Sequence, residues 1–378
     1  MKRKDIWLYY AVVLIYWFST STYLPVMTPY LKEIGIDYAM IGLIGGAYGF
    51  MQMLVRLPLG ILSDRINKRK IFVIMGVALS AISSLGLYIG ENEVYILFFR
   101  GVTGAAAASW VIMTVLFSGY FEREKTAEKI SMLTTMNNLG QFLAMILGGT
   151  AAGYFGYKAT FLLGGAAGIV GTVMSFCIKE DIREREEKIS VKQLLEVMKD
   201  KKLINSGILC LMVQFIAFGA TNTFTSEKAV NIGGDAVQLG MISVVMTIPR
   251  VLSAAVCSYL FAKKVKCRYI VFASFAVTAV SCIVSALAEN MAMIYTGSVL
   301  GGAGTGMGYA ALIATCSENI EREKRSTAMG AFQAIFGIGT FLGPIVIGGI
   351  AQNMGIGNGF YFAAVTAAVT AVCTLFMI

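Results

Sequence analysis

Three arginines lie inside long apolar stretches of this sequence, where a charged side chain needs a reason to be present. They are Arg56, Arg100 and Arg250. A charge at membrane depth is costly unless it faces protein or water, so a functional role is the first interpretation of each. A guanidinium stays protonated and pairs well with carboxylate or phosphate groups, which favours an anionic ligand. Arg250 is the strongest candidate, because no motif explains it.

Each arginine also has a plainer explanation. Arg56 lies two turns before a polar motif and could simply brace it. Arg100 could be a helix-packing residue bonded to backbone carbonyls. In the sequence repeat described below, Arg250 corresponds to Gln52, so Arg250 and Arg56 project from the same face of equivalent helices, one turn apart.

Acid–base and metal chemistry have few residues to use. The sequence has no histidine, and its 7 cysteines are scattered without a paired spacing. We expect none of the 22 acidic residues to lie inside a membrane span, with Glu227 among those at an outer end. The sequence therefore predicts no metal site, no cofactor and no catalytic residue. It also weakens proton coupling, which usually depends on a buried carboxylate.

The elements that carry these residues are membrane helices. The chain is 57% hydrophobic and 14% charged, whereas a soluble domain carries about 25% charged residues. Its apolar residues form blocks of roughly 20, the length that spans a bilayer. The first block is too long for a signal-peptide core, so we expect it to be retained. We predict twelve spans, at approximately 6–30, 40–63, 71–90, 94–120, 128–153, 157–178, 204–228, 238–262, 269–288, 291–317, 327–351 and 357–378.

The distribution of basic residues predicts the orientation. Of the 31 Lys and Arg residues, 25 fall in the termini and loops of one side, and only Lys32, Lys158 and Lys228 fall on the other. By the positive-inside rule the basic side is cytoplasmic, with both chain termini there. The formal net charge of +9 is thus a topology signal, and no nucleic-acid partner is needed to explain it.

The two halves of the sequence repeat. IGIDYAMIG at 34–42 recurs as IGGDAVQLG at 232–240, and EREK at 122–125 recurs at 321–324. Six spans per half give a parallel two-fold repeat, on which many transporters are built. We predict an N-terminal six-helix bundle, a cytoplasmic linker with a short amphipathic helix and a C-terminal six-helix bundle, at 1–180, 181–203 and 204–378.

A polar motif at the predicted cytoplasmic end of the second span carries a family resemblance. The segment Gly60–Lys70 reads GILSDRINKRK, with a glycine, an Asp-Arg pair and a basic tail. It resembles the loop 2–3 signature of the major facilitator superfamily, except that Asn67 replaces the usual glycine. Arg100, followed by Gly101 and Gly104, resembles the family's second signature. The resemblance implies two six-helix bundles that rock about a mid-membrane site.

The same motif suggests a latch between the cytoplasmic ends of the bundles. Asp64 could cap the positive end of the eleventh span, and Arg65 and Arg69 could pair with Glu122. The alternative is that these charges only set the topology. We predict a gating role for five residues: Gly60, Asp64, Arg65, Arg69 and Glu122.

The family's central cavity is lined by spans 1, 4, 7 and 10, so the resemblance also implies a set of polar lining residues, to which spans 5 and 11 add Asn137, Gln141 and Gln333. Each of them is as readily an interhelical hydrogen bond as a ligand contact. Together with the three arginines, the candidates are Trp17, Thr20, Asn137, Gln141, Gln214, Asn222, Tyr309 and Gln333.

We predict a secondary active transporter of a small organic solute, anionic or amphiphilic, that works by alternating access. The alternative within the family is a proton-coupled efflux antiporter for drugs or metabolites. That alternative is weakened because Ala144-Met145 stands where such antiporters carry a glycine-proline pair in the fifth span. Two alternatives come from other classes: a membrane-embedded enzyme, for which the sequence offers no catalytic constellation, and a transporter-like sensor, which would bind its ligand without moving it. We expect a multi-pass protein of the plasma membrane, functional as a monomer, with the lipid bilayer and a small-molecule substrate as its partners.

Overall fold

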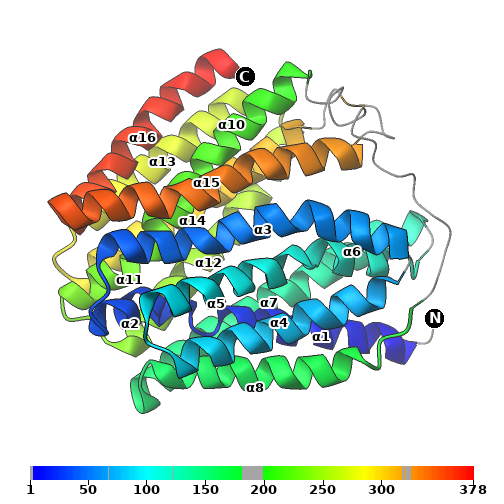
Figure 1. Cartoon of the computed structure of the whole chain (residues 1–378). Helices are drawn as coiled ribbons and strands as arrows, with labels where there is room; N and C mark the ends of the chain where they lie inside the picture. Colours follow the sequence, from blue (N-terminus) through cyan, green and yellow to red (C-terminus); the bar gives the residue numbers. More distant parts are fainter. Residues whose placement is uncertain (1–2, 67, 122, 181–198, 317–319, 321–324) are drawn as a thin grey trace. The chain divides into compact units, whose positions relative to one another are not determined.

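The computed structural model describes residues 3–66, 68–121, 123–180, 199–316, 320 and 325–378, and these form an all-helical chain (Figure 1). The predicted linker helix, within 181–198, lies outside the described residues. In chain order the helices are α1 (Arg3–Ser21), η1 (Leu24–Val26), α2 (Met27–Glu33), α3 (Tyr38–Ile66), α4 (Arg69–Ile89), α5 (Glu93–Ala108), α6 (Trp110–Ser118), α7 (Arg123–Phe155), α8 (Lys158–Ser175), α10 (Lys201–Ile216), η2 (Ala217–Thr221), α11 (Asn222–Asn231), α12 (Ala236–Ala262), α13 (Cys267–Ala286), α14 (Met291–Cys316), α15 (Arg325–Met354) and α16 (Ile356–Met377).

The helices confirm all twelve predicted spans as helical segments. Within the described ranges, 11 helices are long and apolar enough to cross a membrane. The remaining predicted span, 128–153, corresponds to α7, which is long enough but more polar. Its charged first turns and its amides, such as Asn137 and Gln141, lower its hydropathy.

Three spans are broken by local irregularities. The first is interrupted at the 3₁₀ turn η1, whose second residue is Pro25; proline cannot donate a backbone hydrogen bond. The fourth is interrupted at Ser109, whose Oγ donates to the carbonyl of Ala106 at 2.7 Å; such back-bonding often bends helices. The seventh carries the π-helical turn η2 in its middle.

The chain divides into two compact units, each of which contains pieces of both sequence halves. Unit 1 comprises Met1–Tyr30, Ala47–Lys188 and Asp235–Met241, and unit 2 comprises Leu31–Gly46, Ile189–Gly234 and Ile242–Ile378. The beginning of α3 thus belongs to unit 2, with the C-terminal helices. The beginning of α12 belongs to unit 1, with the N-terminal helices.

Unit 1 is built on helices α1, α4, α5, α7 and α8. Among these, α4 runs beside α8, and α1 packs on both α7 and α8 (Figure 1). Its core holds an aromatic cluster, in which Tyr9 packs on Phe117 with ring centroids 5.0 Å apart. The Tyr9 hydroxyl donates to the carbonyl of Met113 at 2.7 Å, which satisfies its polar end.

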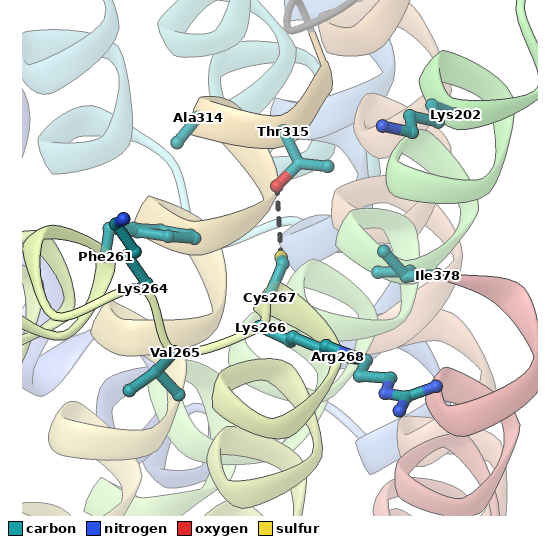
Figure 2. A pocket seen from close by; sticks show the side chains of 10 residues that line it. All are labelled: Lys202, Phe261, Lys264, Val265, Lys266, Cys267, Arg268, Ala314, Thr315 and Ile378. Carbon is teal, nitrogen blue, oxygen red and sulfur yellow. Dashed lines mark hydrogen bonds between the residues drawn. The ribbon is translucent and has the colours of Figure 1, made fainter.

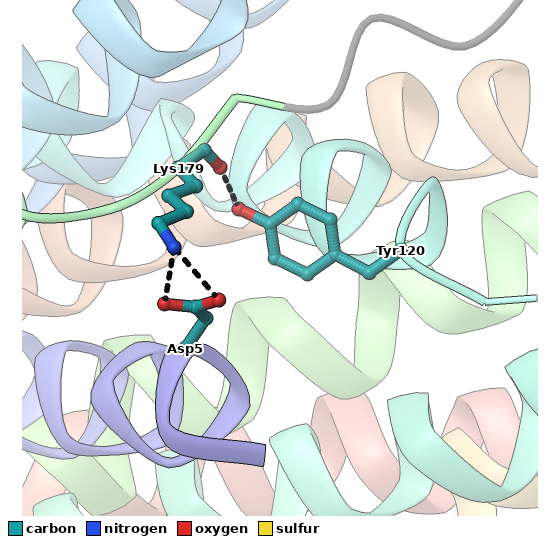
Figure 3. A network of polar contacts seen from close by, with 3 residues as sticks. All are labelled: Asp5, Tyr120 and Lys179. Atoms are coloured by element: carbon teal, nitrogen blue, oxygen red, sulfur yellow. Dashed lines mark hydrogen bonds and ion pairs between the residues drawn. The ribbon is translucent and has the colours of Figure 1, made fainter. Parts of the chain in front are cut away.

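One end of unit 1 is tied by a polar network of three residues. The ammonium of Lys179 contacts Asp5 of α1 at 3.3 Å, and the Tyr120 hydroxyl donates to the Lys179 carbonyl (Figure 3). These residues come from the two ends of the N-terminal sequence half and from the segment after α6. The contacts hold that segment and the chain after α8 against the start of α1.

Unit 2 is built on α10, α13, α14, α15 and α16. Helix α13 packs along both α14 and α16, and α10 packs along α15 and α14. Small residues make these contacts close. A Cβ at Gly304 of α14, for instance, would lie 2.8 Å from the backbone oxygen of Ser274 in α13. Helix pairs in membranes often associate through small residues in this way.

Candidate functional site

Arg250 lies half-buried in α12, within unit 2, beside the start of α11. Its Nη2 donates a long hydrogen bond of 3.5 Å to Oδ1 of Asn222. Its Nε is buried, with no hydrogen-bond partner in the part of the chain that the structure describes. The ion pairs found between described residues do not include it. An unsatisfied buried donor is costly, and a bound carboxylate or phosphate would satisfy this one.

The partner of Arg250 follows directly on the π-helical turn η2. A π-turn adds a residue to the helix and rotates the side chains that follow it, and such turns are frequent at functional sites. Asn222 is the first residue after this turn. The next residue, Thr223, donates from its hydroxyl to the carbonyl of Phe218 at 2.5 Å, which satisfies one carbonyl of the widened turn.

Helix α14 approaches the backbone of α12 at Arg250. A Cβ on Gly306 would lie 2.8 Å from the Cα of Arg250, so only glycine allows this contact. One turn further along α14 is Tyr309, half-buried, whose ring meets Phe336 of α15 edge-on with centroids 5.8 Å apart. The other two predicted residues of unit 2, Gln214 and Gln333, are half-buried in α10 and α15.

In unit 1, Arg100 is enclosed by aromatic rings. Its side chain is 8% exposed. Its guanidinium carbon lies 4.8 Å from the ring centre of Tyr48 and 5.9 Å from that of Tyr23. Its Nη1 donates to the Tyr23 hydroxyl at 3.5 Å, and this hydroxyl lies 3.0 Å from Oγ1 of Thr103. Arg100 of α5 thus contacts α3 and the turn before η1, as a packing residue would.

The remaining unit 1 candidates differ in how fully their polar groups are used. Thr20 donates to the carbonyls of Tyr16 and Trp17 in its own helix, at 3.3 and 3.2 Å. On α7, Gln141 donates to Asn137 at 2.5 Å, so this pair satisfies itself in part. Arg56 is half-buried in α3.

Trp17, another unit 1 candidate, has an unsatisfied hydrogen-bond donor. Its ring meets that of Trp110 edge-on with centroids 5.7 Å apart. Its indole Nε1 is buried and has no hydrogen-bond partner among the described residues. A buried indole N–H usually donates to an acceptor, so a ligand could supply the acceptor that this group lacks.

The structure describes only part of the predicted latch. Glu122 and the side chain of Asp64 lie outside the described residues. Arg65 is exposed, and a Cβ on Gly60 would meet open space, so packing does not demand glycine there. Arg69 is half-buried at the start of α4.

Lys70, the last residue of the motif, makes specific contacts within unit 1. Its Nζ donates to the carbonyl of Phe176 at 2.7 Å. Its backbone N–H donates to the carboxylate of Glu180 at 3.2 Å. These bonds join the start of α4 to the end of α8, a pairing that the motif itself did not suggest.

Glu227, one of the acids expected at an outer end, lies in α11, four residues before the end of the candidate span Lys201–Asn231, and it is only 3% exposed. Its Oε1 accepts a hydrogen bond of 3.2 Å from the hydroxyl of Tyr38, the first residue of α3. The helix continues past Glu227 to Asn231, and the first turn of α3 covers the carboxylate.

Basic residues also line a cavity of about 520 Å³ in unit 2, at the ends of α10, α13 and α14 (Figure 2). Thr315 donates to the sulfur of Cys267 there at 3.0 Å. None of the residues predicted to bind substrate lines it. The lining residues are Lys202, Phe261, Lys264, Val265, Lys266, Cys267, Arg268, Ala314, Thr315 and Ile378.

Sequence comparison relates the chain to a family of transporters. The family model of the Major Facilitator Superfamily matches residues 9–229 and 207–378. An uncharacterised MFS-type transporter of Methanocaldococcus jannaschii is 24% identical over 371 residues, which cover 93% of this chain and 94% of that protein. The quinolone resistance protein NorA of Staphylococcus aureus is 26% identical over 218 residues. That match covers 56% of this chain and 55% of NorA.

Solved structures share the fold at low sequence identity. The nucleoside transporter NupG superposes with a TM-score of 0.83 at 14% identity, covering 99% of this chain and 98% of that one. A bacterial homologue of the human lysosomal transporter Spinster gives 0.82 at 13% identity, covering 98% and 96%. The all-helical fold is therefore that of these transporters.

Proposed function

Because the chain belongs to the major facilitator superfamily, we propose that it is a secondary active transporter which moves a small organic solute by alternating access. It is a multi-pass membrane protein, and we place it in the plasma membrane with both termini in the cytoplasm. The repeat of two six-span halves supports this mechanism. We assign it no catalytic role, and we propose that a monomer is the functional form.

We propose that the solute is anionic or amphiphilic and that Arg250 contacts its anionic group. The observation that carries this assignment is the buried Nε of Arg250, which has no hydrogen-bond partner in the described residues. Asn222 already engages the other end of the guanidinium, at 3.5 Å, and so holds the side chain in place. A carboxylate or phosphate would meet the free edge of the fork and could accept a hydrogen bond there.

Trp17 and Arg56 are the companion candidates in unit 1. The unsatisfied indole N–H of Trp17 supports a role for it, whereas the aromatic enclosure of Arg100 supports a packing role. The amide pair Asn137–Gln141 would then contribute polarity to α7 without a charge.

The alternative is a proton-coupled antiporter that exports drugs or metabolites. Two observations favour it: the similarity to a protein named for quinolone resistance, and the buried carboxylate of Glu227. A carboxylate at membrane depth is the usual proton carrier in coupled transporters. The alternative requires transport to depend on a proton gradient, so uptake measured with and without an imposed gradient would test it.

A thermal-shift screen tests the role of Arg250. The purified protein is screened against metabolite and drug libraries, and each stabilising compound is then tested on Arg250→Ala and on the control variant Arg3→Ala, which removes an exposed arginine at the start of α1. Losing a charged hydrogen bond weakens binding by about tenfold or more, so the stabilisation should largely disappear in Arg250→Ala and persist in the control. A compound that stabilises the parent and Arg250→Ala equally would show that Arg250 does not bind it.

A further inference from the structure

The basic cavity of unit 2 has no part in the proposed transport. Its volume of about 520 Å³ lies within the range of about 300–1,000 Å³ that is usual for ligand sites. It is found where α10 and α13 begin and where α12 and α14 end, which the distribution of basic residues predicts to be the cytoplasmic end of these spans. No Asp or Glu is among the described residues that line it, whereas four lining residues are basic: Lys202, Lys264, Lys266 and Arg268.

Arg268 brings a guanidinium with an unsatisfied donor to this cavity. Its Nη2 donates to the hydroxyl of Tyr269 at 3.0 Å, and its guanidinium carbon lies 4.8 Å from the centre of the Tyr269 ring. Its Nε is buried and has no hydrogen-bond partner among the described residues. A basic residue that only sets the topology needs its charge but no buried N–H. Because a buried donor without an acceptor is costly, this N–H indicates a place for an acceptor.

Lys264 occupies a backbone position at which glycine is usual. After α12 ends, the N–H of Val265 donates to the carbonyl of Leu260 at 3.1 Å, which closes the turn at the end of the helix. Lys264 precedes Val265 and has φ +59°, the one positive φ outside glycine among the described residues. Helices that end in this way usually carry glycine or asparagine there. The lysine instead supplies a cation to the wall of the cavity.

The start of α13 adds the positive end of a helix. Lys266 is its N-cap residue and makes no side-chain cap hydrogen bond, because an ammonium group has no acceptor. The first N–H groups of a helix lack an acceptor within it, and its dipole favours an anion there. No ion pair joins Lys264, Lys266 or Arg268 to another described residue. Among the lining residues only Ile378 could bring a carboxylate, as a chain terminus, so positive charge remains in excess.

We propose that this cavity binds a phosphate group, either the headgroup phosphate of an anionic phospholipid or a free phosphate. A phosphate oxygen accepts from Nε of Arg268, while the ammonium groups of Lys264 and Lys266 balance the charge. The walls are also partly apolar, with Phe261 and Val265 beside the cations (Figure 2). A lipid suits both kinds of wall, and basic pockets between membrane helices can bind lipid headgroups. The lining therefore favours the lipid as the source of the phosphate.

Thermal denaturation of the full chain in a neutral detergent tests the site. Short-chain phosphatidylglycerol, short-chain phosphatidylcholine and inorganic phosphate are titrated separately at low salt. We expect phosphatidylglycerol to raise the melting temperature, whereas phosphatidylcholine should do little because its quaternary ammonium meets the cations. If inorganic phosphate acts at the same concentration as phosphatidylglycerol, the phosphate site is supported and a free phosphate is its ligand. Equal stabilisation by the two lipids, or no stabilisation by any of the three probes, overturns the proposal.

Two variants then locate the site. The half-maximal concentration of phosphatidylglycerol should rise about tenfold or more in Arg268→Gln and about fivefold in Lys264→Gly.

The second variant separates binding from folding. Lys264→Gly places glycine at a positive φ, which glycine adopts readily, so without a probe it should melt at or above the wild-type temperature. The matched control is Lys263→Gln, which removes an exposed cation that does not line the cavity, and it should titrate like the wild type. Unchanged titrations in both cavity variants, or an equal loss in the control, overturn the proposal. No transported solute takes part, so the result does not depend on the proposed function.

Discussion

The first turns of α3 and α12 arise from the same repeated sequence, but their residues make different contacts. Each follows a glycine with positive φ, +88° at Gly35 and +89° at Gly233. Each is capped by an aspartate, Asp37 or Asp235, which accepts a hydrogen bond from the backbone three residues later. The repeat thus preserves the backbone geometry of the two helix starts.

The difference lies in the residue that begins each helix. Helix α3 begins with Tyr38, which reaches Glu227 and is tied to Gln352. Helix α12 begins with Ala236, and its first turns pack on glycines: a Cβ on Gly149 of α7 would lie 2.7 Å from the Cα of Gly240. A symmetric scaffold therefore carries ionisable chemistry at one helix start and only close packing at the other.

The largest effect should come from breaking the close packing that both regions share. In unit 2, a Cβ on Gly348 of α15 would lie 2.5 Å from the backbone oxygen of Tyr38, whereas a Cβ on Gly349 would meet open space. Gly348→Ala should therefore destabilise the protein by about 1–3 kcal/mol. Gly349→Ala should be neutral or slightly stabilising, since alanine favours helix. Thermal denaturation in detergent measures both, and equal melting temperatures for the two variants would contradict this packing.

An intermediate loss of stability should follow from replacing Tyr38 by alanine, the residue type that begins α12. Tyr38→Ala removes the hydroxyl that bonds Glu227 and the ring that meets Phe224 edge-on, with centroids 6.1 Å apart. We expect a loss of about 1–2 kcal/mol from the two contacts together. Tyr38→Phe keeps the ring and should retain about half of that stability. If both variants have the melting temperature of the wild type, neither the hydrogen bond nor the ring contact stabilises this region.

The smallest loss of stability should come from removing the helix caps Asp37 and Asp235. This loss should differ slightly between the starts of α3 and α12. Asp235 both accepts from the N–H of Gln238 at 2.8 Å and, through its own N–H, donates to that side chain at 3.0 Å. Asp37 accepts from Met40 at 2.7 Å, and methionine cannot return the bond. Each alanine variant should cost about 1 kcal/mol, with Asp235→Ala the larger because it breaks a reciprocal pair. A larger loss in Asp37→Ala, by thermal denaturation, would reverse this order.

These residues also show what the sequence could predict and what it could not. Hydropathy predicted the helices, because a span needs a long apolar run, and only the polar α7 escapes the simplest criterion. The repeat predicted the equivalence of the two helix starts. Neither could predict that Tyr38 meets Glu227, 189 residues away. That contact depends on which helices pack together, and a glutamate near the end of an apolar run looks solvated from sequence alone.

The arginines show the same limit at the candidate site. The sequence identified Arg100 and Arg250 as charges at membrane depth and favoured Arg250 as a ligand contact, because no motif explains it. Their neighbours could not be predicted: Tyr23 and Tyr48 enclose Arg100, while Arg250 meets Asn222 and keeps a buried donor unsatisfied. The π-turn before Asn222 could not be predicted either, because it leaves no pattern in the hydropathy.

The central proposal is that this protein moves a small organic solute, anionic or amphiphilic, with Arg250 as the contact for its anionic group. The most direct test is counterflow uptake in proteoliposomes, with a panel of radiolabelled anionic, neutral and cationic solutes offered to the wild type and to Arg250→Ala. The account predicts uptake of at least one anionic solute by the wild type, reduced about tenfold or more in Arg250→Ala. Uptake of cations alone, or equal anion uptake by both proteins, would contradict it.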